Sequence, residues 1–198
     1  MSPADALEPH PRTPRERLVR SALELVGRQG PSGTGLRAVV ERADAPRGSL
    51  QHYFPGGKRQ LVTEALELAG RAGARSARPA HPAGRPSEVL VALVETWRRW
   101  LTESQYATGC PVVATVVDAS DADAGLREAA AAAFAHWQSA VADELVTAGV
   151  DVARATSLAG VVLAALEGAI LVCRVRHDVQ PLDDLLAELA PVLDAAAG

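Results

Sequence analysis

The stretch that most constrains the fold of this chain, residues 34–59, holds two short helical segments, each closed by a break. The first segment follows Thr34, a favourable N-cap, and repeats apolar residues at helical spacing: Leu36, Val39, Val40 and Ala43. Pro46 cannot continue that helix but suits the first turn of a new one, which we expect to end at Tyr53 or Phe54. Because Pro55-Gly56-Gly57 breaks the chain again, the stretch predicts two short helices joined by a tight turn.

Most side chains of the second helix have to face outward, because only Leu50, Tyr53 and Phe54 can turn inward. The outward positions carry a guanidinium, a glycine, a hydroxyl, an amide and an imidazole, which are groups that read base edges or approach phosphates. Lys58, the only lysine, opens the next helix and is placed to anchor a phosphate. A solvated polar helix face is the alternative. We predict DNA contacts by Thr34, Arg37, Arg47, Gly48, Ser49, Gln51, His52, Tyr53 and Lys58.

The pattern GSLxHYF, followed by a short turn and lysine, resembles the N-terminal domain of the TetR family of one-component transcriptional repressors. The matching residues are Leu36, Ala43, Gly48, Ser49, Leu50, His52, Tyr53, Phe54 and Lys58. The segments APRGSL and FPGGK, and GCP at 109–111, resemble its LmrA/YxaF-like branch. The chain departs from the family at Asp44, where glycine is usual, and at Gln51, where an aromatic residue is frequent. The resemblance implies a ligand-binding C-terminal domain and homodimerisation through the last two helices.

Composition and charge agree with an all-α protein that meets DNA at its N-terminal end. Aromatic residues make up only 4% of the chain, and no alternating strand pattern is bounded by hairpin dipeptides. The net charge is −4, but residues 1–60 carry ten Arg and Lys against six Asp and Glu, whereas residues 61–198 carry ten against eighteen. The basic excess therefore coincides with the predicted DNA-binding stretch.

Helical signals continue along the whole chain. A capping box, Thr13-Pro14-Arg15-Glu16, opens a first helix that we expect to close at Gly27–Gly30. Further helices are expected over 58–73, over 87–103 with Ser87 as cap, after a break or from a kinked start at Gly109 and Pro111, and over 126–148, 151–176 and 182–193. The predicted fold is all-α with about nine helices: an N-terminal three-helix helix-turn-helix domain and a C-terminal helical bundle.

Three domain segments follow from these signals. Residues 1–12 are predicted to be a flexible N-terminal arm, residues 13–57 the DNA-binding domain, and residues 58–198 the ligand-binding and dimerisation domain. Residues 74–86, rich in proline, are expected to form a loop or linker.

A candidate ligand pocket is indicated by all three tryptophans falling within one predicted sub-bundle. Ordinary core packing is the alternative for each aromatic residue, and Glu167 could bind the ligand or pair with Arg174 or Arg98. We predict a small hydrophobic or aromatic effector. The predicted lining is Trp97, Trp100, Leu101, Tyr106, Cys110, Val113, Val117, Phe134, Trp137, Val141, Leu163 and Glu167.

A dimer interface is indicated by the predicted helix over 151–176, which is apolar almost all round and so needs cover on every side. Small residues there would allow close backbone approach, and the last helix repeats leucines. The predicted interface residues are Ala159, Gly160, Ala164, Gly168, Leu182, Leu185, Leu186, Leu189 and Val192.

Several other classes of function are disfavoured by the sequence. Cys110 and Cys173 lack metal-site spacing and are expected to be reduced thiols, so we predict no metal and no cofactor. No secretory leader opens the chain, and the longest apolar run, sixteen residues from Leu158 to Cys173, is short for a membrane span. We therefore predict a cytoplasmic protein without a membrane partner. A nucleophile and base drawn from Cys110 and His136 lacks an orienting group, so we expect no enzyme.

The sequence therefore predicts a repressor that binds a palindromic operator in double-stranded DNA as a homodimer and is released by a small-molecule effector. The alternatives are an architectural DNA-binding protein without an effector and a redox sensor that acts through Cys110.

Overall fold

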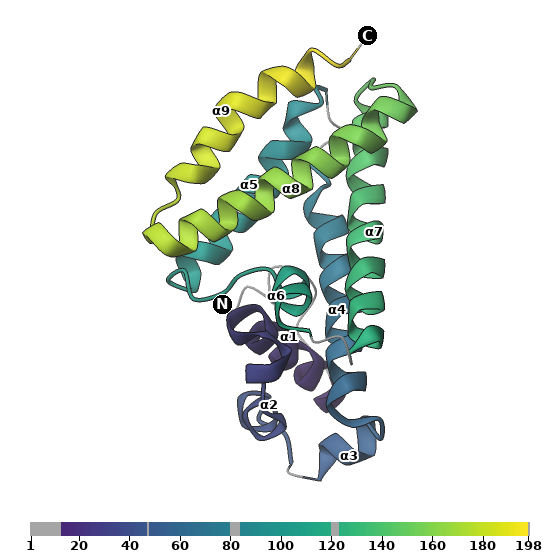
Figure 1. Ribbon diagram of the computed structural model, residues 1–198, viewed down its shortest axis with the longest axis vertical. Helices are drawn as coiled ribbons and strands as arrows, with labels where there is room; N and C mark the ends of the chain where they lie inside the picture. Colours follow the sequence, from purple (N-terminus) through teal and green to yellow (C-terminus); the bar gives the residue numbers. More distant parts are fainter. Residues whose placement is uncertain (1–12, 47, 80–83, 120–122, 198) are drawn as a thin grey trace. The chain divides into compact units, whose positions relative to one another are not determined.

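The structure is a computed structural model that describes residues 13–46, 48–79, 84–119 and 123–197. Within these ranges the regular elements are nine α-helices, and the one β-type pairing is an isolated bridge between Val150 and Ala197 (Figure 1). The helices are α1 (Pro14–Gly33), α2 (Leu36–Arg42), α3 (Ser49–Tyr53), α4 (Gly57–Ser76), α5 (Ser87–Glu103), α6 (Pro111–Asp118), α7 (Ala124–Thr147), α8 (Val152–Arg176) and α9 (Gln180–Asp194). The predicted all-α fold is confirmed.

The helices group into two compact units. The first unit comprises Met1–Ala72 and Thr108–Phe134, and the second comprises Gly73–Ala107 and Ala135–Gly198, so α4 and α7 contribute residues to both. The predicted assignment of DNA binding to residues 13–57 and of ligand binding and dimerisation to residues 58–198 concerns function and stays a prediction. The predicted arm at residues 1–12 lies outside the described residues.

The first unit is built around α1, whose start agrees with the sequence prediction. The Thr13 hydroxyl accepts from the Glu16 backbone N–H while the Glu16 carboxylate accepts from the Thr13 backbone N–H, which completes a capping box. The α1 backbone kinks at Gly30, at the end of the segment where closure was predicted, and helical residues then extend to Gly33. The buried core joins α1, α2, α3 and α4 through Leu18, Val19, Ala22, Leu23, Val39, Val40, Ala43, Leu50, Phe54, Leu61, Ala65 and Leu68.

Helix α6 also belongs to the first unit because it packs on α1. The Gly109 N–H donates to the Gly27 carbonyl at 2.9 Å, and the Ser32 N–H donates to the Asp118 carboxylate at 2.5 Å. Pro111 occupies the first turn of α6, which starts after Cys110, so of the predicted break and kinked start the structure has the break. One bond between backbone groups and one bond to the Asp118 side chain therefore join α6 and the residues before it to α1.

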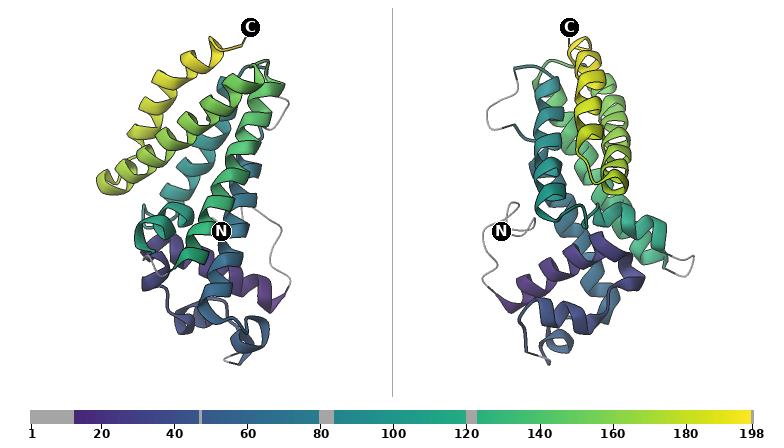
Figure 2. Two further views of the ribbon diagram at one scale, coloured as in Figure 1. Left: turned by 45° about the vertical axis from the view of Figure 1, so that its right-hand side comes forward. Right: turned by 90° about the vertical axis from the view of Figure 1, so that its left-hand side faces the viewer.

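The second unit consists mainly of α5, α8, α9 and the C-terminal part of α7. Figures 1 and 2 show α9 running beside α8, and α9 also packs on α5. Ser87 was predicted to cap α5, but the N-cap is Pro86 and the Ser87 hydroxyl donates to the Asp194 carboxylate at 3.0 Å. Arg98 donates to Asp183 at 2.5 Å, which ties α5 to α9 a second time.

Helix α8 is longer than the sixteen-residue apolar run that the sequence analysis singled out. Its 25 residues make it long and apolar enough to cross a membrane by length and composition alone, a test that core helices of soluble proteins also pass. Leu158, Leu166 and Ile170 are buried by the chain itself, and α9 and α5 pack against the helix. The contacts of α8 are those of a bundle core helix.

Replacing Gly27 with Ala is expected to destabilise the protein by about 1–3 kcal/mol, because overpacking forces backbone shifts. The added Cβ would lie 2.6 Å from the Gly109 carbonyl oxygen, in a segment that is itself hydrogen-bonded to Gly27. Urea unfolding monitored by circular dichroism measures the change in the free energy of unfolding.

The matched control for this prediction is Gly125→Ala, a glycine of α7 in the same unit with open space where its Cβ would lie. An exposed helical glycine gains up to about 1 kcal/mol of stability on replacement by Ala. Equal unfolding free energies for the two variants would contradict the close approach of α6 to α1.

Candidate nucleic-acid interface

Helices α2 and α3 are joined by a tight turn whose geometry depends on Asp44. The Asp44 backbone is left-handed, with φ 46°, and its N–H donates to the Glu41 carbonyl while the Ala45 N–H donates to the Val40 carbonyl. Asp tolerates this conformation better than most residues, although glycine suits it best. The chain therefore leaves α2 and enters α3 within a few residues, as predicted.

Two details of the predicted helix-turn-helix differ in the structure. The second helix starts at Ser49 and not at Pro46, because the Pro46 carbonyl instead accepts hydrogen bonds from the Ser49 N–H and hydroxyl. Thr34 does not cap α2, whose N-cap is Gly35. The Thr34 side chain is 2% exposed, and its hydroxyl donates to the Gly30 carbonyl at the end of α1. Because this hydroxyl is buried and bonded within the chain, Thr34 is not part of the proposed interface.

The described side chains of α3 divide as the sequence predicted. Leu50 and the following Phe54 are buried in the core, whereas Gln51 and His52 are exposed and Ser49 and Tyr53 are half-buried. The rings of His52 and Tyr53 meet edge to face at 4.8 Å, which orients the imidazole. Arg47 lies outside the described residues.

Gly48, the N-cap of α3, is not required to be a glycine by its backbone conformation or by the packing of the described residues. Its φ is −83°, which any residue can adopt, and no other described atom lies within 4 Å of where a Cβ would stand. The position is exposed. A glycine in such open space leaves room for the backbone of another molecule to approach.

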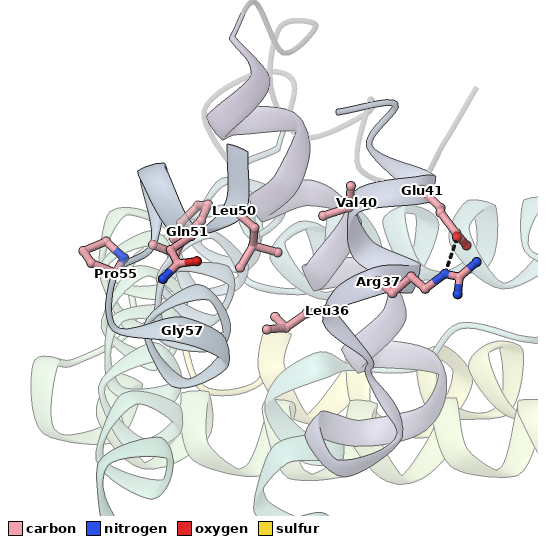
Figure 3. A pocket seen from close by; sticks show the side chains of 9 residues that line it. Leu36, Arg37, Val40, Glu41, Leu50, Gln51, Pro55 and Gly57 are labelled. Atoms are coloured by element: carbon pink, nitrogen blue, oxygen red, sulfur yellow. Dashed lines mark hydrogen bonds and ion pairs between the residues drawn. The ribbon is translucent and has the colours of Figure 1, made fainter. Parts of the chain in front are cut away.

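A groove of about 550 Å³ separates α2 from α3 on this surface. Figure 3 shows Leu36 on α2 and Leu50 on α3 pointing into it, with Gln51 and Pro55 on the α3 side. Arg37 and Glu41 are bonded at 2.8 Å on the opposite side, and this hydrogen bond raises the pKa of Arg37. Such a groove offers apolar walls to a thymine methyl group and polar ends to base edges.

Lys58 lies in the first turn of α4, as predicted. Its ammonium donates to the Ser32 carbonyl at 3.3 Å, which places the charge beside the end of α1, and the side chain is partly exposed. A single exposed bond to a carbonyl leaves the positive charge available to a phosphate.

The predicted pocket residues are divided between the two units. Trp97, Trp100, Leu101, Tyr106, Trp137, Val141, Leu163 and Glu167 lie in the second unit, and Cys110, Val113, Val117 and Phe134 lie in the first. Within the second unit the rings of Trp97 and Trp100 meet at 4.8 Å, and Tyr106 lies against His177. The buried Trp100 indole nitrogen has no hydrogen-bond partner among the described residues.

The predicted dimer residues occupy two different faces. Ala159 and Leu182 are fully buried within the chain, Gly160, Leu185, Leu186 and Leu189 are half-buried, and Ala164, Gly168 and Val192 are exposed. Besides Val152 at its start, α8 carries four exposed large apolar residues that the sequence pattern did not single out, namely Val161, Leu171, Val172 and Val175. With Ala164 and Gly168 they recur every three or four residues and form one apolar stripe, which we call the α8 stripe.

Both cysteine thiols are buried in the structure. Burial raises the pKa of the Cys173 thiol, which keeps it protonated and poorly nucleophilic. Among the residues that the structure describes, no group of three or more His, Cys, Asp and Glu side chains is arranged to hold a metal ion.

Comparison with known proteins identifies relatives along nearly the whole chain. Residues 18–65 match bacterial regulatory proteins of the tetR family, and residues 86–188 match the C-terminal domain of LmrA/YxaF-like transcriptional regulators. An uncharacterized HTH-type transcriptional regulator of Mycobacterium tuberculosis is 38% identical over 185 residues, 91% of this chain and 94% of that protein. The HTH-type transcriptional regulator LmrA of Bacillus subtilis is 31% identical over 169 residues, 85% and 90% of the two chains.

Solved structures show the same fold. A regulatory protein TetR from Rhodobacter sphaeroides superposes with a TM-score of 0.77 at 22% identity, covering 89% of this chain and 96% of that chain. A TetR transcriptional regulator from Chloroflexus aurantiacus gives a TM-score of 0.70 at 24% identity, covering 91% and 93%.

Replacing Gly48 with Ala is expected to leave the free energy of unfolding nearly unchanged while weakening DNA binding by about tenfold or more, because a methyl group would hold the backbone away from the DNA. Fluorescence anisotropy with labelled duplex DNA and urea unfolding measure the two quantities. Gly125→Ala is the matched control, since that glycine also faces open space. Unchanged DNA affinity in Gly48→Ala would show that the open space at Gly48 serves no contact.

Proposed function

Because this chain belongs to the TetR family of transcriptional regulators, we propose that it is a homodimeric repressor that binds a palindromic operator and is released by a small hydrophobic or aromatic effector. The resemblance to the family, and to its LmrA/YxaF-like branch, is confirmed by the matches at both ends of the chain. Membership of a family of transcriptional regulators is established. The homodimer, the palindromic operator and the release by an effector form the proposal.

The observation that carries the proposal is the exposed face of α3 beside Gly48. A base-reading helix needs polar side chains outward and close backbone approach, and Gln51 and His52 supply the first while Gly48 supplies the second. Lys58 and Arg37, the latter bonded to the exposed Glu41, are proposed to contact phosphates, and Arg47 is included from the sequence. The basic excess of residues 1–60 favours the same surface.

Dimerisation is proposed through the α8 stripe together with Leu185, Leu189 and Val192 of α9. Val175 is 83% exposed and Leu171 is 49% exposed, which is costly for large apolar side chains aligned on one helix face. A second copy of the chain would bury them, and Gly168, open to a distance of 4 Å, would let the two α8 helices approach closely. A two-fold dimer presents its two recognition helices to a palindrome.

The effector is proposed to bind in the second unit near Trp97 and Trp100. Their aromatic rings favour a flat or hydrophobic ligand, and the buried indole N–H of Trp100 favours a ligand with a hydrogen-bond acceptor. Glu167, 7% exposed on α8, is a candidate carboxylate for a polar group of the same ligand. Release follows if the ligand prefers a conformer whose recognition helices no longer fit the half-site spacing.

The alternatives receive less support. A redox sensor needs a reactive thiol, whereas both thiols are buried. An architectural DNA-binding protein needs neither the aromatic cluster nor a fixed half-site spacing. Membership of a family of transcriptional regulators also supports our proposal that the protein is cytoplasmic. The same membership supports action on DNA over catalysis.

Footprinting on the DNA that flanks the protein's own gene, repeated with a panel of aromatic compounds, tests the function as a whole. The expected result is protection of one short palindrome, lost with a compound that also quenches tryptophan fluorescence. Diffuse protection that no compound alters would support the architectural alternative.

Lys58→Ala is expected to weaken binding to all DNA sequences and to lower the slope of log affinity against log salt by about one, because one phosphate contact is removed. A salt titration of the wild type and the variant measures the slope. An unchanged slope would contradict a phosphate contact by Lys58.

Leu171→Glu is expected to convert the dimer into a folded monomer, because a buried unpaired carboxylate at the interface costs several kcal/mol. Analytical ultracentrifugation measures the molecular mass, and circular dichroism checks the fold. Val152→Glu is the matched control, since Val152 is 66% exposed on the same helix but lies on the opposite face from the α8 stripe. A dimeric Leu171→Glu variant would remove the α8 stripe from the interface.

A further inference from the structure

The recognition helix α3 is too short to hold its own orientation. It has five residues, and Leu50 is the only one of them that is buried. Helices of this length are marginal in water without outside support. Leu50, with Phe54 and Tyr53 at the end of the helix, anchors α3 in the core, and its orientation depends further on what fixes the turn before it and the turn after it.

The turn before α3 is held by Arg17 of α1. Its Nε donates to the Ala43 carbonyl at 2.9 Å, and its Nη2 donates to the Asp44 carbonyl at 3.2 Å. These are carbonyls at the C-terminal end of α2, where a cation is favoured and where unpaired acceptors remain. Because Asp44 takes a left-handed conformation that glycine adopts more readily, the two bonds support a turn that the backbone alone favours less.

The turn after α3 is held by Arg15, two residues earlier on α1. The Arg15 guanidinium carbon lies 5.3 Å from the centroid of the buried Phe54 ring, at the end of α3. The same guanidinium bonds Glu64 of α4 at 2.6 Å. The contact joins the start of α1 to the end of the recognition helix.

A polar relay extends this contact to the backbone of the turn. Gln60 donates to the Glu64 carboxylate at 3.1 Å, and its amide oxygen accepts from the Gly56 backbone N–H at 2.9 Å. Arg15, Glu64 and Gln60 therefore form a chain of bonds that ends on the turn after α3.

We propose that Arg15 and Arg17 are positioning residues that set the orientation of α3 for operator recognition, acting through the two turns and not through contact with DNA. The inference rests on the proposed DNA-binding function. It adds two residues of α1, together with Glu64 and Gln60 of α4, to the residues that support the proposed interface from within the protein.

A phosphate contact is the competing role for Arg15, which is exposed, and for Arg17, which is half-buried, and the bonding pattern opposes it. The Arg17 donors are directed at two backbone carbonyls, and the Arg15 charge is balanced by Glu64. Lysine can replace a point charge at a phosphate but cannot bond two carbonyls with the same planar fork. Arg17→Lys therefore separates the two roles.

The experiment uses the duplex that the full-length wild-type protein selects from a random DNA library, and a scrambled duplex of equal length. Positioning predicts that Arg17→Ala and Arg17→Lys both weaken binding to the selected duplex by about tenfold, because charge-assisted bonds are lost. Binding to the scrambled duplex and the salt slope are expected to stay within error of the wild type. Full rescue by Lys, or a slope lowered by about one in Arg17→Ala, would overturn the proposal in favour of a phosphate contact.

Glu64→Gln gives a second test, because the two explanations predict opposite changes in DNA affinity. Removing a negative charge from a DNA-binding unit should tighten binding to all DNA if only electrostatics matters. Positioning instead predicts weaker binding to the selected duplex by about threefold, because the relay to Gly56 loses its charged member. Glu67→Gln, an exposed carboxylate on the same helix, is the control for the charge effect alone.

The outcomes separate this inference from the function on which it rests. If the wild type selects no sequence, the proposed function is overturned and the inference with it. If the wild type selects a sequence and the Arg17 and Glu64 variants bind it as tightly as wild type, the inference alone is overturned. Should Arg17→Ala fail to fold, Arg17→Lys and Glu64→Gln, which keep the size or shape of the side chain, decide the question.

Discussion

The structure of the first unit depends on hydrogen bonds that α1 makes with the ends of shorter helices. Arg17 closes the C-terminal end of α2, and Arg42 of α2 returns a pair of bonds to Glu24 of α1. The α1 carbonyl at Gly27 accepts the bond that fixes the start of α6. A long helix with a sound N-terminal cap is a stable element, and short helices gain order by bonding to it. The proposed DNA-reading surface therefore shares its hydrogen bonds and its core with α1.

The helices could be predicted from the sequence because apolar residues repeat at helical spacing, and the burial of Leu50 and Phe54 followed from the same rule. The helix caps that were predicted wrongly are those where a side chain had two plausible hydrogen-bond partners. Ser87 could cap α5, but Asp194, far along the chain, accepts its hydroxyl instead. Thr34 could cap α2, but its hydroxyl donates to the Gly30 carbonyl at the end of α1. Residue spacing alone does not tell which of several possible acceptors a hydroxyl will bond in the folded chain.

The association of α6 with α1 was equally hidden, because each of its two hydrogen bonds uses a backbone donor and only one of them, to Asp118, involves a side chain. The Gly109 N–H, the Gly27 carbonyl and the Ser32 N–H carry no side-chain signature in the sequence. The faces of α8 were hidden for a different reason. The sequence of α8 is apolar on every side, so it does not tell which residues will be buried. The packing of α5 and α9 against α8 buries some of them and leaves those of the α8 stripe exposed. Ala159 and Val161, two residues apart, fall on different sides of that division.

Glycine shows most clearly what a structure adds to a sequence pattern. Gly27 and Gly48 are both compatible with helical surroundings, but a Cβ at Gly27 would meet the Gly109 backbone, whereas a Cβ at Gly48 would meet open space. The first glycine is explained completely by a neighbour within the chain. The described residues offer no such neighbour for Gly48, nor for Gly168 within the α8 stripe, and Gly35 and Gly125 face open space as well. Open space at an exposed glycine leaves room for the backbone of another molecule to approach closely. Gly48 lies on the proposed DNA-reading surface and Gly168 on the proposed dimer face, and at these two positions the room coincides with a proposed contact.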